Sequence, residues 1–352
     1  MDGSSPYGKG TGEDGYAAEG EAKGKGKGKK GKEGKEGKGK DKKGKKGKKG
    51  HAGEDGEDFT HDFELVKAAP TVPYTEHTYT YGEVNGEPLQ MKVHRPENSG
   101  SAPPCIIYFA GSGFSGTGMR LNGKKMAFFV DRGYAMVACP YRGHRGENSG
   151  QTHFPTPLFE ALAALRYLRT NAETIGIDPK RIISMGGSSG GWYAVMLALC
   201  GTKKFRDAGL LGGDGLDTDP VCCAVDYFGP QDFELFEAEW EKHRGTGPTT
   251  DKGYFKFLGI SAWPDDLTQV KRASTLSYIG PDTPPIFVTH GAKDAGVPIS
   301  QSEALVGKLK EQSVQHEYHP HPEAEHGGYQ FTEPDWLEKV AQFLKKHVPA
   351  EK

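Results

Sequence analysis

The sequence has few cysteines, and their placement excludes two kinds of site. The five cysteines are an odd number, none belongs to a CxxC spacing, and all lie in apolar segments, at Cys105, Cys139, Cys200, Cys222 and Cys223. We therefore expect neither a disulfide framework nor a zinc site. The thiols are interpreted as small buried hydrophobic side chains in a reducing compartment.

Long hydrophobic runs are also missing. The longest apolar helix-like run, residues 191–200, is about half of the roughly 18 residues that a membrane-spanning helix requires. Residues 1–10 contain no basic segment leading into an apolar one, so no secretory signal is expected. The sequence predicts a protein without a membrane span and with a cytoplasmic location.

After Tyr16, the first 58 residues contain almost none of the branched and aromatic side chains that build a core. Residues 23–49 contain 15 Lys, three acidic residues and otherwise only Gly. Such a segment cannot bury enough apolar surface to offset its ordering entropy, so we predict a disordered tail over residues 1–58. Two interpretations of the tail stay open: weak polyanion binding or nuclear targeting, and a solvated tail without a partner.

From residue 63 onward, strand-like and helix-like patterns alternate. Helical periodicity is clear at residues 157–172 and 300–312. Segments that read as strands buried on both faces lie at residues 105–110, 134–139, 181–186, 222–229 and 285–291. This alternation predicts an α/β fold with a mostly parallel central sheet and helices on both faces. Residues 232–273 are expected to be irregular.

A strand, a group of small residues and an apolar helix follow one another between Arg181 and Tyr193. This is a G-x-S-x-G pattern in the strand–turn–helix context where such a turn exposes a nucleophilic serine. Two frames fit: the frame centred on Ser188 is favoured, and the frame centred on Ser189 is the alternative. A phosphate-binding loop is excluded because no Lys-Ser/Thr pair follows and the spacing is not G-x-G-x-x-G.

A second glycine-rich loop, residues 109–114, follows the buried strand at 105–110. Small residues there would allow backbone N–H groups to approach a tetrahedral oxyanion. The candidate donors are the N–H groups of Gly111, Ser112 and Ser189.

An acid and a base follow the serine in the order that this arrangement requires. Asp294 comes just after the strand at 285–291, where a parallel sheet gathers functional groups, and His326 lies in a glycine-containing loop near the end of the chain. Asp282 precedes the same strand and would lie at the opposite edge of the sheet. Other histidines are rivals of His326, at positions His144, His153, His290, His319 and His321.

Together these motifs resemble the carboxylesterase branch of the α/β-hydrolases, with its feruloyl-esterase-like, acetylxylan-esterase-like and lipase-like members. The resemblance covers about residues 79–348 and rests on segments such as GYAMVACPYRG, GGSSGGW and PPIFVTHGAKDAGVP. It implies an α/β-hydrolase catalytic domain over residues 59–352 that cleaves small esters through an acyl-enzyme without a cofactor or metal. Short acyl chains and acylated sugars would be the substrates. By this resemblance the triad is Ser188, Asp294 and His326.

The sequence departs from the family in the oxyanion loop, where the loss of the histidine is the departure that matters. The family usually has His-Gly-Gly-Gly, whereas this sequence has Ala110 in place of the histidine, followed by Gly-Ser-Gly. The histidine usually anchors the loop, so its loss affects the loop geometry while the backbone donors remain. Two alternatives stay open: a prolyl-oligopeptidase-type serine peptidase, and a non-catalytic binding protein that has kept the fold.

Overall fold

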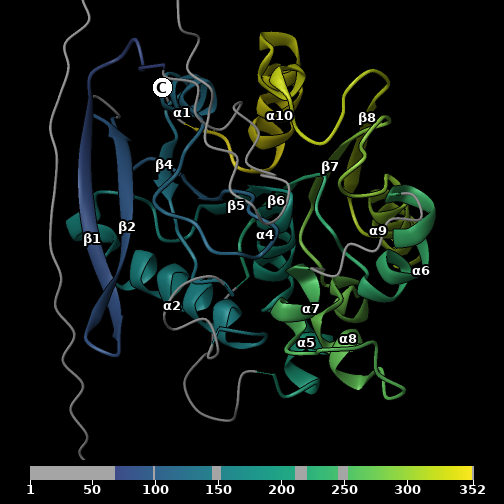
Figure 1. Ribbon diagram of the computed structural model, residues 1–352. Coiled ribbons are helices and arrows are strands. Elements are labelled where there is room, and N and C mark those ends of the chain that lie inside the picture. Colours follow the sequence, from purple (N-terminus) through teal and green to yellow (C-terminus); the bar gives the residue numbers. More distant parts are fainter. Residues whose placement is uncertain (1–67, 98–99, 145–151, 211–219, 245–252, 351–352) are drawn as a thin grey trace, which may run out of the picture. The chain divides into compact units, whose positions relative to one another are not determined.

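The computed structural model describes residues 68–97, 100–144, 152–210, 220–244 and 253–350 (Figure 1). Of the two units of the chain, Met1–Gly53 and Glu54–Lys352, only the second contains described residues. The predicted disordered tail over residues 1–58 lies outside the described residues, and its extent stays a prediction.

Within the described residues, eight strands form one sheet in the order β1-β2-β4-β3-β5-β6-β7-β8. The pairs β1–β2 and β2–β4 are antiparallel, and all the other neighbouring pairs are parallel. The strands are β1 (Tyr74–Val84), β2 (Glu87–Pro96), β3 (Cys105–Phe109), β4 (Ala135–Ala138), β5 (Ile182–Gly187), β6 (Cys223–Tyr227), β7 (Ile286–Gly291) and β8 (His316–His321). The predicted mostly parallel sheet is confirmed, and the long β1–β2 hairpin forms one edge (Figure 1).

Helices cover both faces of this sheet. The larger helices of the described residues are α1 (Gly123–Val130), α2 (Thr156–Thr170), α4 (Ser189–Leu199), α6 (Phe233–Arg244), α9 (Ser300–Glu311) and α10 (Pro334–His347). The shorter ones are α3 (Ala172–Ile175), α5 (Lys203–Asp207), α7 (Gly253–Leu258), α8 (Thr268–Ala273) and the 3-10 turns η3 (Thr275–Tyr278) and η4 (Tyr329–Thr332). None of the helices in the described ranges is long and apolar enough to cross a membrane.

The continuous apolar strands are explained by two hydrophobic layers, one on each face. In β3, Ile106 and Tyr108 pack into the layer that contains the apolar residues of α1 and α10. The alternating residues Ile107 and Phe109 pack into the opposite layer, with α2, α4 and α9. Successive side chains of a strand point to opposite faces, so a strand covered on both sides must be apolar throughout.

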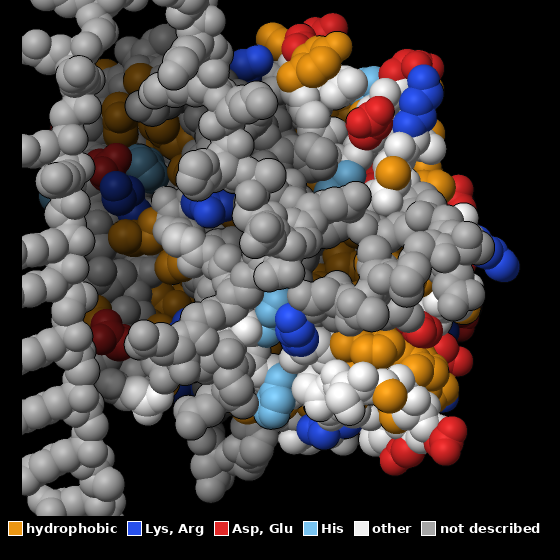
Figure 2. Space-filling model, viewed as in Figure 1, with side chains coloured by type: hydrophobic (Ala, Val, Ile, Leu, Met, Phe, Trp, Pro, Cys, Tyr) orange, Lys and Arg blue, Asp and Glu red, His pale blue; other side chains and the backbone are white. Residues whose placement is uncertain are grey.

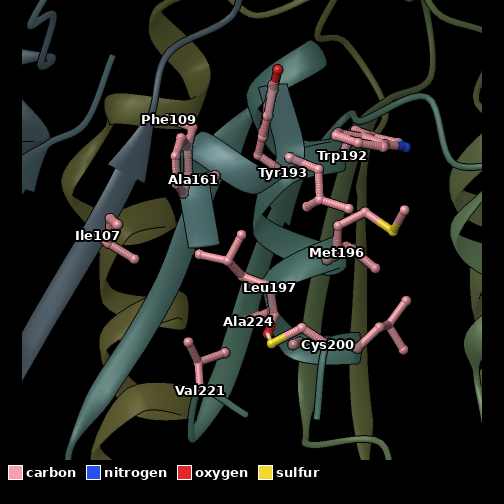
Figure 3. Close-up of a cluster of buried hydrophobic side chains, with 14 of the residues drawn as sticks. Ile107, Phe109, Ala161, Trp192, Tyr193, Met196, Leu197, Cys200, Val221 and Ala224 are labelled. Carbon is pink, nitrogen blue, oxygen red and sulfur yellow. Dashed lines mark hydrogen bonds between the residues drawn. The ribbon is translucent and has the colours of Figure 1, made fainter. Parts of the chain in front are cut away.

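Helix α4 lies at the centre of the second layer and is fully buried along its whole length. Figure 3 shows Trp192, Tyr193, Met196 and Leu197 of this helix in the same cluster as Phe109 of β3. Because α4 is apolar on all sides, it cannot shift toward solvent without exposing part of the core. Ser188, which directly precedes α4, is therefore held in a fixed position at the C-terminal edge of the sheet.

The expectation of an irregular stretch over residues 232–273 is wrong. Within its described parts it contains α6, α7 and α8, and the aromatic residues of these helices pack together, for example Phe236 with Trp240 and Tyr254. Helices α7 and α8 are only six residues long, too short to display a helical period. Helix α6 has 12 residues, and Phe233, Phe236 and Trp240 stand at helical spacing, so its signal was present and was overlooked.

Candidate functional site

Ser188 lies between the end of β5 and the first residue of α4, in strained backbone geometry. Its φ and ψ angles are 54° and −128°, a conformation that residues with a side chain rarely adopt. The turn is held by two backbone hydrogen bonds: Ser188 N–H donates to the Tyr227 carbonyl oxygen (2.9 Å), and the Ser188 carbonyl oxygen accepts from Gly191 N–H (2.8 Å). The side chain is thereby presented at the C-terminal edge of the sheet.

Two glycines beside the serine leave no room for a side chain. A Cβ atom at Gly186 would lie 2.1 Å from the carbonyl oxygen of Gly190, and a Cβ atom at Gly190 would lie 2.0 Å from the carbonyl oxygen of Phe109. Both clashes involve backbone atoms, which cannot move aside. The steric explanation of the G-x-S-x-G pattern is therefore confirmed, and it fits the frame centred on Ser188.

The structure brings together the three residues that the sequence proposed as a triad. The Oγ atom of Ser188 lies 2.9 Å from Nε2 of His326, and Nδ1 of His326 lies 2.7 Å from Oδ2 of Asp294. A carboxylate oxygen only accepts hydrogen bonds, so Nδ1 carries the hydrogen, and in neutral imidazole Nε2 is then the acceptor. The hydroxyl of Ser188 accordingly donates to His326, which is the arrangement needed to remove its proton.

The carboxylate of Asp294 is almost completely buried and accepts from four donors. Oδ1 accepts from the N–H groups of Gly296 (2.7 Å) and Val297 (2.8 Å), while Oδ2 accepts from His326 and lies 3.2 Å from Nε2 of His290. Burial alone would raise the pKa of Asp294, but the two histidines and their hydrogen bonds outweigh it and hold this pKa well below its usual range. The group is therefore a carboxylate at neutral pH.

His326 follows β8, in the glycine-containing loop that the sequence indicated, and is only 6% exposed. The ring of Phe228 packs against its imidazole edge-to-face, with the centroids 5.1 Å apart. A Cβ atom at Gly296 would lie 2.8 Å from Cγ of His326, so this glycine permits the imidazole to approach Asp294. The positive φ angles of Gly327 (81°) and Gly328 (95°) explain why glycines follow the histidine.

His290 was only a rival candidate in the sequence, and the structure places it behind Asp294. It is the penultimate residue of β7 and is completely buried, with Nδ1 2.7 Å from Ser302 Oγ and Nε2 3.0 Å from the Val297 carbonyl oxygen. That carbonyl and the Asp294 carboxylate only accept, so Nε2 carries a hydrogen and donates to them. His290 therefore orients the acid and does not face Ser188. The short spacing His290-Gly-Ala-Lys-Asp294 at the end of β7 was the sequence signal from which this contact could have been predicted.

The other rival side chains lie elsewhere. His319 stacks on Phe287, and His321 packs against Trp336. Asp282 accepts from the backbone N–H of Lys203 at the start of α5, before β7 begins, as its position at the opposite edge of the sheet predicted. Asp282 and Asp294 therefore lie at opposite ends of β7, and only Asp294 is near His326.

The predicted oxyanion loop reaches the serine, with one unexpected contact. Gly111 lies directly beside Ser188, because a Cβ atom at Gly111 would be 2.9 Å from the Ser188 Cβ. Ser189 is the first residue of α4, so its N–H has no acceptor within the helix. The N–H of Ser112, however, donates to the hydroxyl oxygen of Ser189 (2.9 Å), so its role as an oxyanion donor stays a prediction.

Asp226 is a second buried carboxyl group near the site, and the sequence analysis did not single it out. It lies in β6 and accepts from Gly229 N–H and from Nε2 of Gln231, both at 3.0 Å. Burial raises the pKa of Asp226 to about 7, although His290 and the two donors partly oppose this effect. No sequence pattern distinguished this aspartate, because its burial depends on the neighbouring strands.

A family model described as BD-FAE matches residues 91–309, which is more than half of the 352 residues. The chain belongs to the BD-FAE family. The matched region contains Ser188 and Asp294, whereas His326 follows it. Membership in the BD-FAE family confirms the predicted resemblance to the α/β-hydrolase carboxylesterases.

Individual relatives agree with this BD-FAE assignment. Esterase LipQ from Mycobacterium tuberculosis is 28% identical over 238 residues, which cover 66% of this chain and 52% of the relative. The probable carboxylic ester hydrolase LipM from the same organism is 26% identical over 240 residues, or 67% of this chain and 52% of the relative. The chain thus spans about half the length of these curated relatives.

Solved structures show the same fold. A truncated carbohydrate esterase from gut microbiota superimposes with a TM-score of 0.66 at 21% identity, covering 80% of this chain and 99% of the other. Est2 of Thermogutta terrifontis, with propionate bound, gives a TM-score of 0.60 at 20% identity over 78% of this chain and 96% of the other. At such identities the similarity establishes the α/β-hydrolase fold alone.

Proposed function

We propose that this BD-FAE protein hydrolyses carboxylic esters through an acyl-enzyme, with Ser188 as nucleophile, His326 as general base and Asp294 as the orienting acid. The observation that carries the proposal is the continuous hydrogen-bond chain from Ser188 Oγ to His326 Nε2 (2.9 Å) and from His326 Nδ1 to Asp294 Oδ2 (2.7 Å). A serine hydroxyl is a weak nucleophile unless a neighbouring base removes its proton, and this chain supplies that base.

In the acylation step, Ser188 Oγ attacks the ester carbonyl carbon while its proton moves to His326 Nε2. The buried Asp294 carboxylate stabilises the imidazolium that forms. His326 then gives the proton to the alkoxy oxygen of the leaving alcohol, the carbon–oxygen bond of the ester breaks, and the acyl group remains on Ser188.

Deacylation repeats these transfers with water. His326 takes a proton from water, the resulting hydroxide attacks the acyl carbon, and the proton passes to Ser188 Oγ as the acid leaves. In both steps the negative charge on the carbonyl oxygen would be stabilised by the N–H of Ser189 and by N–H groups of the loop around Gly111 and Ser112. The N-terminus of α4 adds a favourable dipole at the same position.

The substrates we propose are small esters with short acyl chains, acylated sugars among them. Support comes from related folds, because one structural neighbour is a carbohydrate esterase and another holds propionate. The peptidase alternative is less well supported, since the acylamino-acid-releasing enzyme of Arabidopsis thaliana matches over only 28% of its own length. The paired serine and imidazole also favour catalysis over a purely binding role.

The proposal predicts that Ser188→Ala lowers kcat/KM for p-nitrophenyl acetate by at least about 10⁴-fold and abolishes fluorophosphonate labelling. The matched control is Ser184→Ala in β5, whose buried hydroxyl donates to the Ala194 carbonyl oxygen and does not face the site. This control should keep its activity. Mapping the label by peptide fragmentation separates Ser188 from Ser189, and labelling that persists in Ser188→Ala would refute the assignment.

Two finer predictions stay proposals. We propose weak polyanion binding through residues 23–49, on the basis of their positive charge alone. On the face drawn in Figure 2, acidic and basic side chains are mixed among the described residues, so this face adds no support for a polyanion site. A cytoplasmic location, or a nuclear one directed by the same lysines, rests equally on composition.

A further inference from the structure

The oxyanion loop lacks the histidine that usually anchors it, and the structure shows other contacts in its place. The Tyr141 hydroxyl donates to the carbonyl oxygen of Ala110 (2.9 Å), the residue that replaces the histidine. The same hydroxyl lies 2.8 Å from Ser189 Oγ and 2.9 Å from Ser112 Oγ. Ser112 N–H donates to Ser189 Oγ at 2.9 Å. Tyr141, Ser112 and Ser189 thus form one cluster around the loop.

The hydrogen atoms of this cluster can be assigned consistently. The carbonyl of Ala110 only accepts, so the phenolic hydrogen of Tyr141 is directed to it. Ser189 Oγ accepts from Ser112 N–H and can give its own hydrogen to the Tyr141 oxygen. Ser112 Oγ can donate to the second lone pair of the same oxygen. Each donor and each acceptor named here therefore has a partner.

The cluster joins three separate segments at the C-terminal edge of the sheet, and two of its three members are buried while Ser112 is half-buried. Tyr141 follows β4, Ser112 follows β3, and Ser189 begins α4. Tyr141 and Ser189 are only 3% and 1% exposed, and hydrogen bonds in such a low-dielectric environment are strong and rigid. The loop is consequently attached to the residue that directly follows the nucleophile.

The hydrogen bond between Ser112 and Ser189 also affects the geometry of the oxyanion hole. The backbone N–H of Ser189 is one candidate donor, and the loop beside Gly111 supplies the others. Because the Ser189 side chain holds the Ser112 amide, the spacing between these two sets of donors is determined by the cluster. Oxyanion stabilisation depends on donors placed in advance, so small shifts of the loop lower the rate of the chemical step.

We propose that Tyr141, with the hydroxyl groups of Ser189 and Ser112, is the anchor of the oxyanion loop in place of the missing histidine. Tyr141 is a positioning residue: it does not contact the reacting atoms, and it holds the loop through Ala110 and Ser189. The inference rests on the ester hydrolase function proposed above and assigns the geometry of its oxyanion hole to one cluster of side chains.

The test compares Tyr141→Phe with Tyr193→Phe, two changes that each remove one phenolic hydroxyl from neighbouring rings. The ring centroids of Tyr141 and Tyr193 lie 4.3 Å apart, and the Tyr193 hydroxyl has no hydrogen-bond partner among the described residues. With p-nitrophenyl acetate, Tyr141→Phe should lower kcat about 10- to 100-fold, less than the loss of a direct donor, while KM changes by less than about threefold. Tyr193→Phe should behave like the wild type.

The Ki of a transition-state analogue distinguishes the positioning role of Tyr141 from a purely structural one, because a purely structural role would leave this Ki unchanged. A short trifluoromethyl ketone forms a tetrahedral oxyanion on the nucleophile, so its Ki should rise in Tyr141→Phe by the same factor by which kcat/KM falls. Ser189→Ala keeps the backbone N–H and removes only the hydroxyl, so it should show the same changes in kcat and Ki. This variant serves as the test if Tyr141→Phe does not fold. Melting temperatures of all variants serve as the fold control.

The outcomes separate this inference from the proposed function. An active wild type in which Tyr141→Phe and Tyr193→Phe have equal kcat and Ki values overturns the anchor and leaves the esterase intact. A lowered melting temperature with unchanged kcat and Ki does the same, because it shows a purely structural role. A wild type that neither hydrolyses esters nor reacts with fluorophosphonate overturns the proposed function and the anchor together.

Discussion

Replacing Asp294 with asparagine should invert the hydrogen-bond pattern of the triad. The two backbone N–H groups of Gly296 and Val297 require an acceptor, so the amide oxygen of the new side chain should take the place of Oδ1. Its NH₂ group would then face the N–H groups of His326 and His290, which are themselves donors. His326 can relieve this conflict only by moving its hydrogen to Nε2.

That tautomer cannot accept the proton of Ser188, because Nε2 would already carry a hydrogen. We therefore expect kcat to fall by about 10⁴-fold, which corresponds to a loss of about 5 kcal/mol in transition-state stabilisation. Asp294→Ala leaves His326 free to keep its hydrogen on Nδ1, so it should lose no more activity than Asp294→Asn.

The assay is p-nitrophenyl acetate hydrolysis at pH 8, together with the rate of fluorophosphonate labelling. Asp282→Asn is the matched control, because Asp282 lies before β7 and accepts from the backbone of Lys203. It should retain wild-type kcat. The reasoning is refuted if Asp294→Asn keeps more than about a tenth of the wild-type kcat, or if the control loses as much.

Two further predictions concern stability. Gly190→Ala should prevent folding or lower the melting temperature strongly, because its Cβ atom would lie 2.0 Å from the Phe109 carbonyl oxygen, whereas Gly307→Ala in α9 meets no atom within 4 Å and should stabilise by about 0.5–1 kcal/mol. Calorimetry of both variants checks this. The raised pKa of Asp226, about 7, means that the folded state binds more protons than the unfolded state between about pH 4 and 7, so this group lowers stability as the pH rises through that window. Between pH 5 and 8 this loss spans about two pH units, so Asp226→Asn should remove up to about 2.7 kcal/mol of the difference between the urea unfolding free energies at these two pH values; an unchanged difference would contradict it.

Much of the fold followed from local patterns. The strands at 105–110, 181–186 and 285–291 were predicted because a strand covered on both faces must be apolar throughout, and each is buried along its length in the structure. The turn at Ser188 was recognised from its local pattern, and the clash of a side chain at Gly186 with Gly190 is local, whereas the clash at Gly190 with Phe109 of the adjacent strand is a tertiary contact. Within residues 232–273, α7 and α8 were missed because helices of six residues carry little periodic signal, whereas the 12-residue α6 did carry one and was overlooked.

The chemistry of the candidate site depended more on long-range contacts. Ser188 and His326 are 138 residues apart, and the sequence offered several other histidines. His290 was judged a rival to His326 because nothing in the sequence shows that it lies behind Asp294. The partners of Ser112, 29 and 77 residues away, could not be read from the loop either.

The sequence alone indicated most of the strands and helices outside residues 232–273, a serine at a sharp turn between a strand and a helix, and an acid and a base that follow in order. These features depend on hydrophobic period and on the steric needs of glycine, which act over short distances along the chain. Only the tertiary structure decided which histidine meets the serine, which one holds the acid, and that the Tyr141 hydroxyl donates to Ala110 in the loop predicted to form the oxyanion hole. Those choices are made by hydrogen bonds between segments that only the strand order of the sheet brings together.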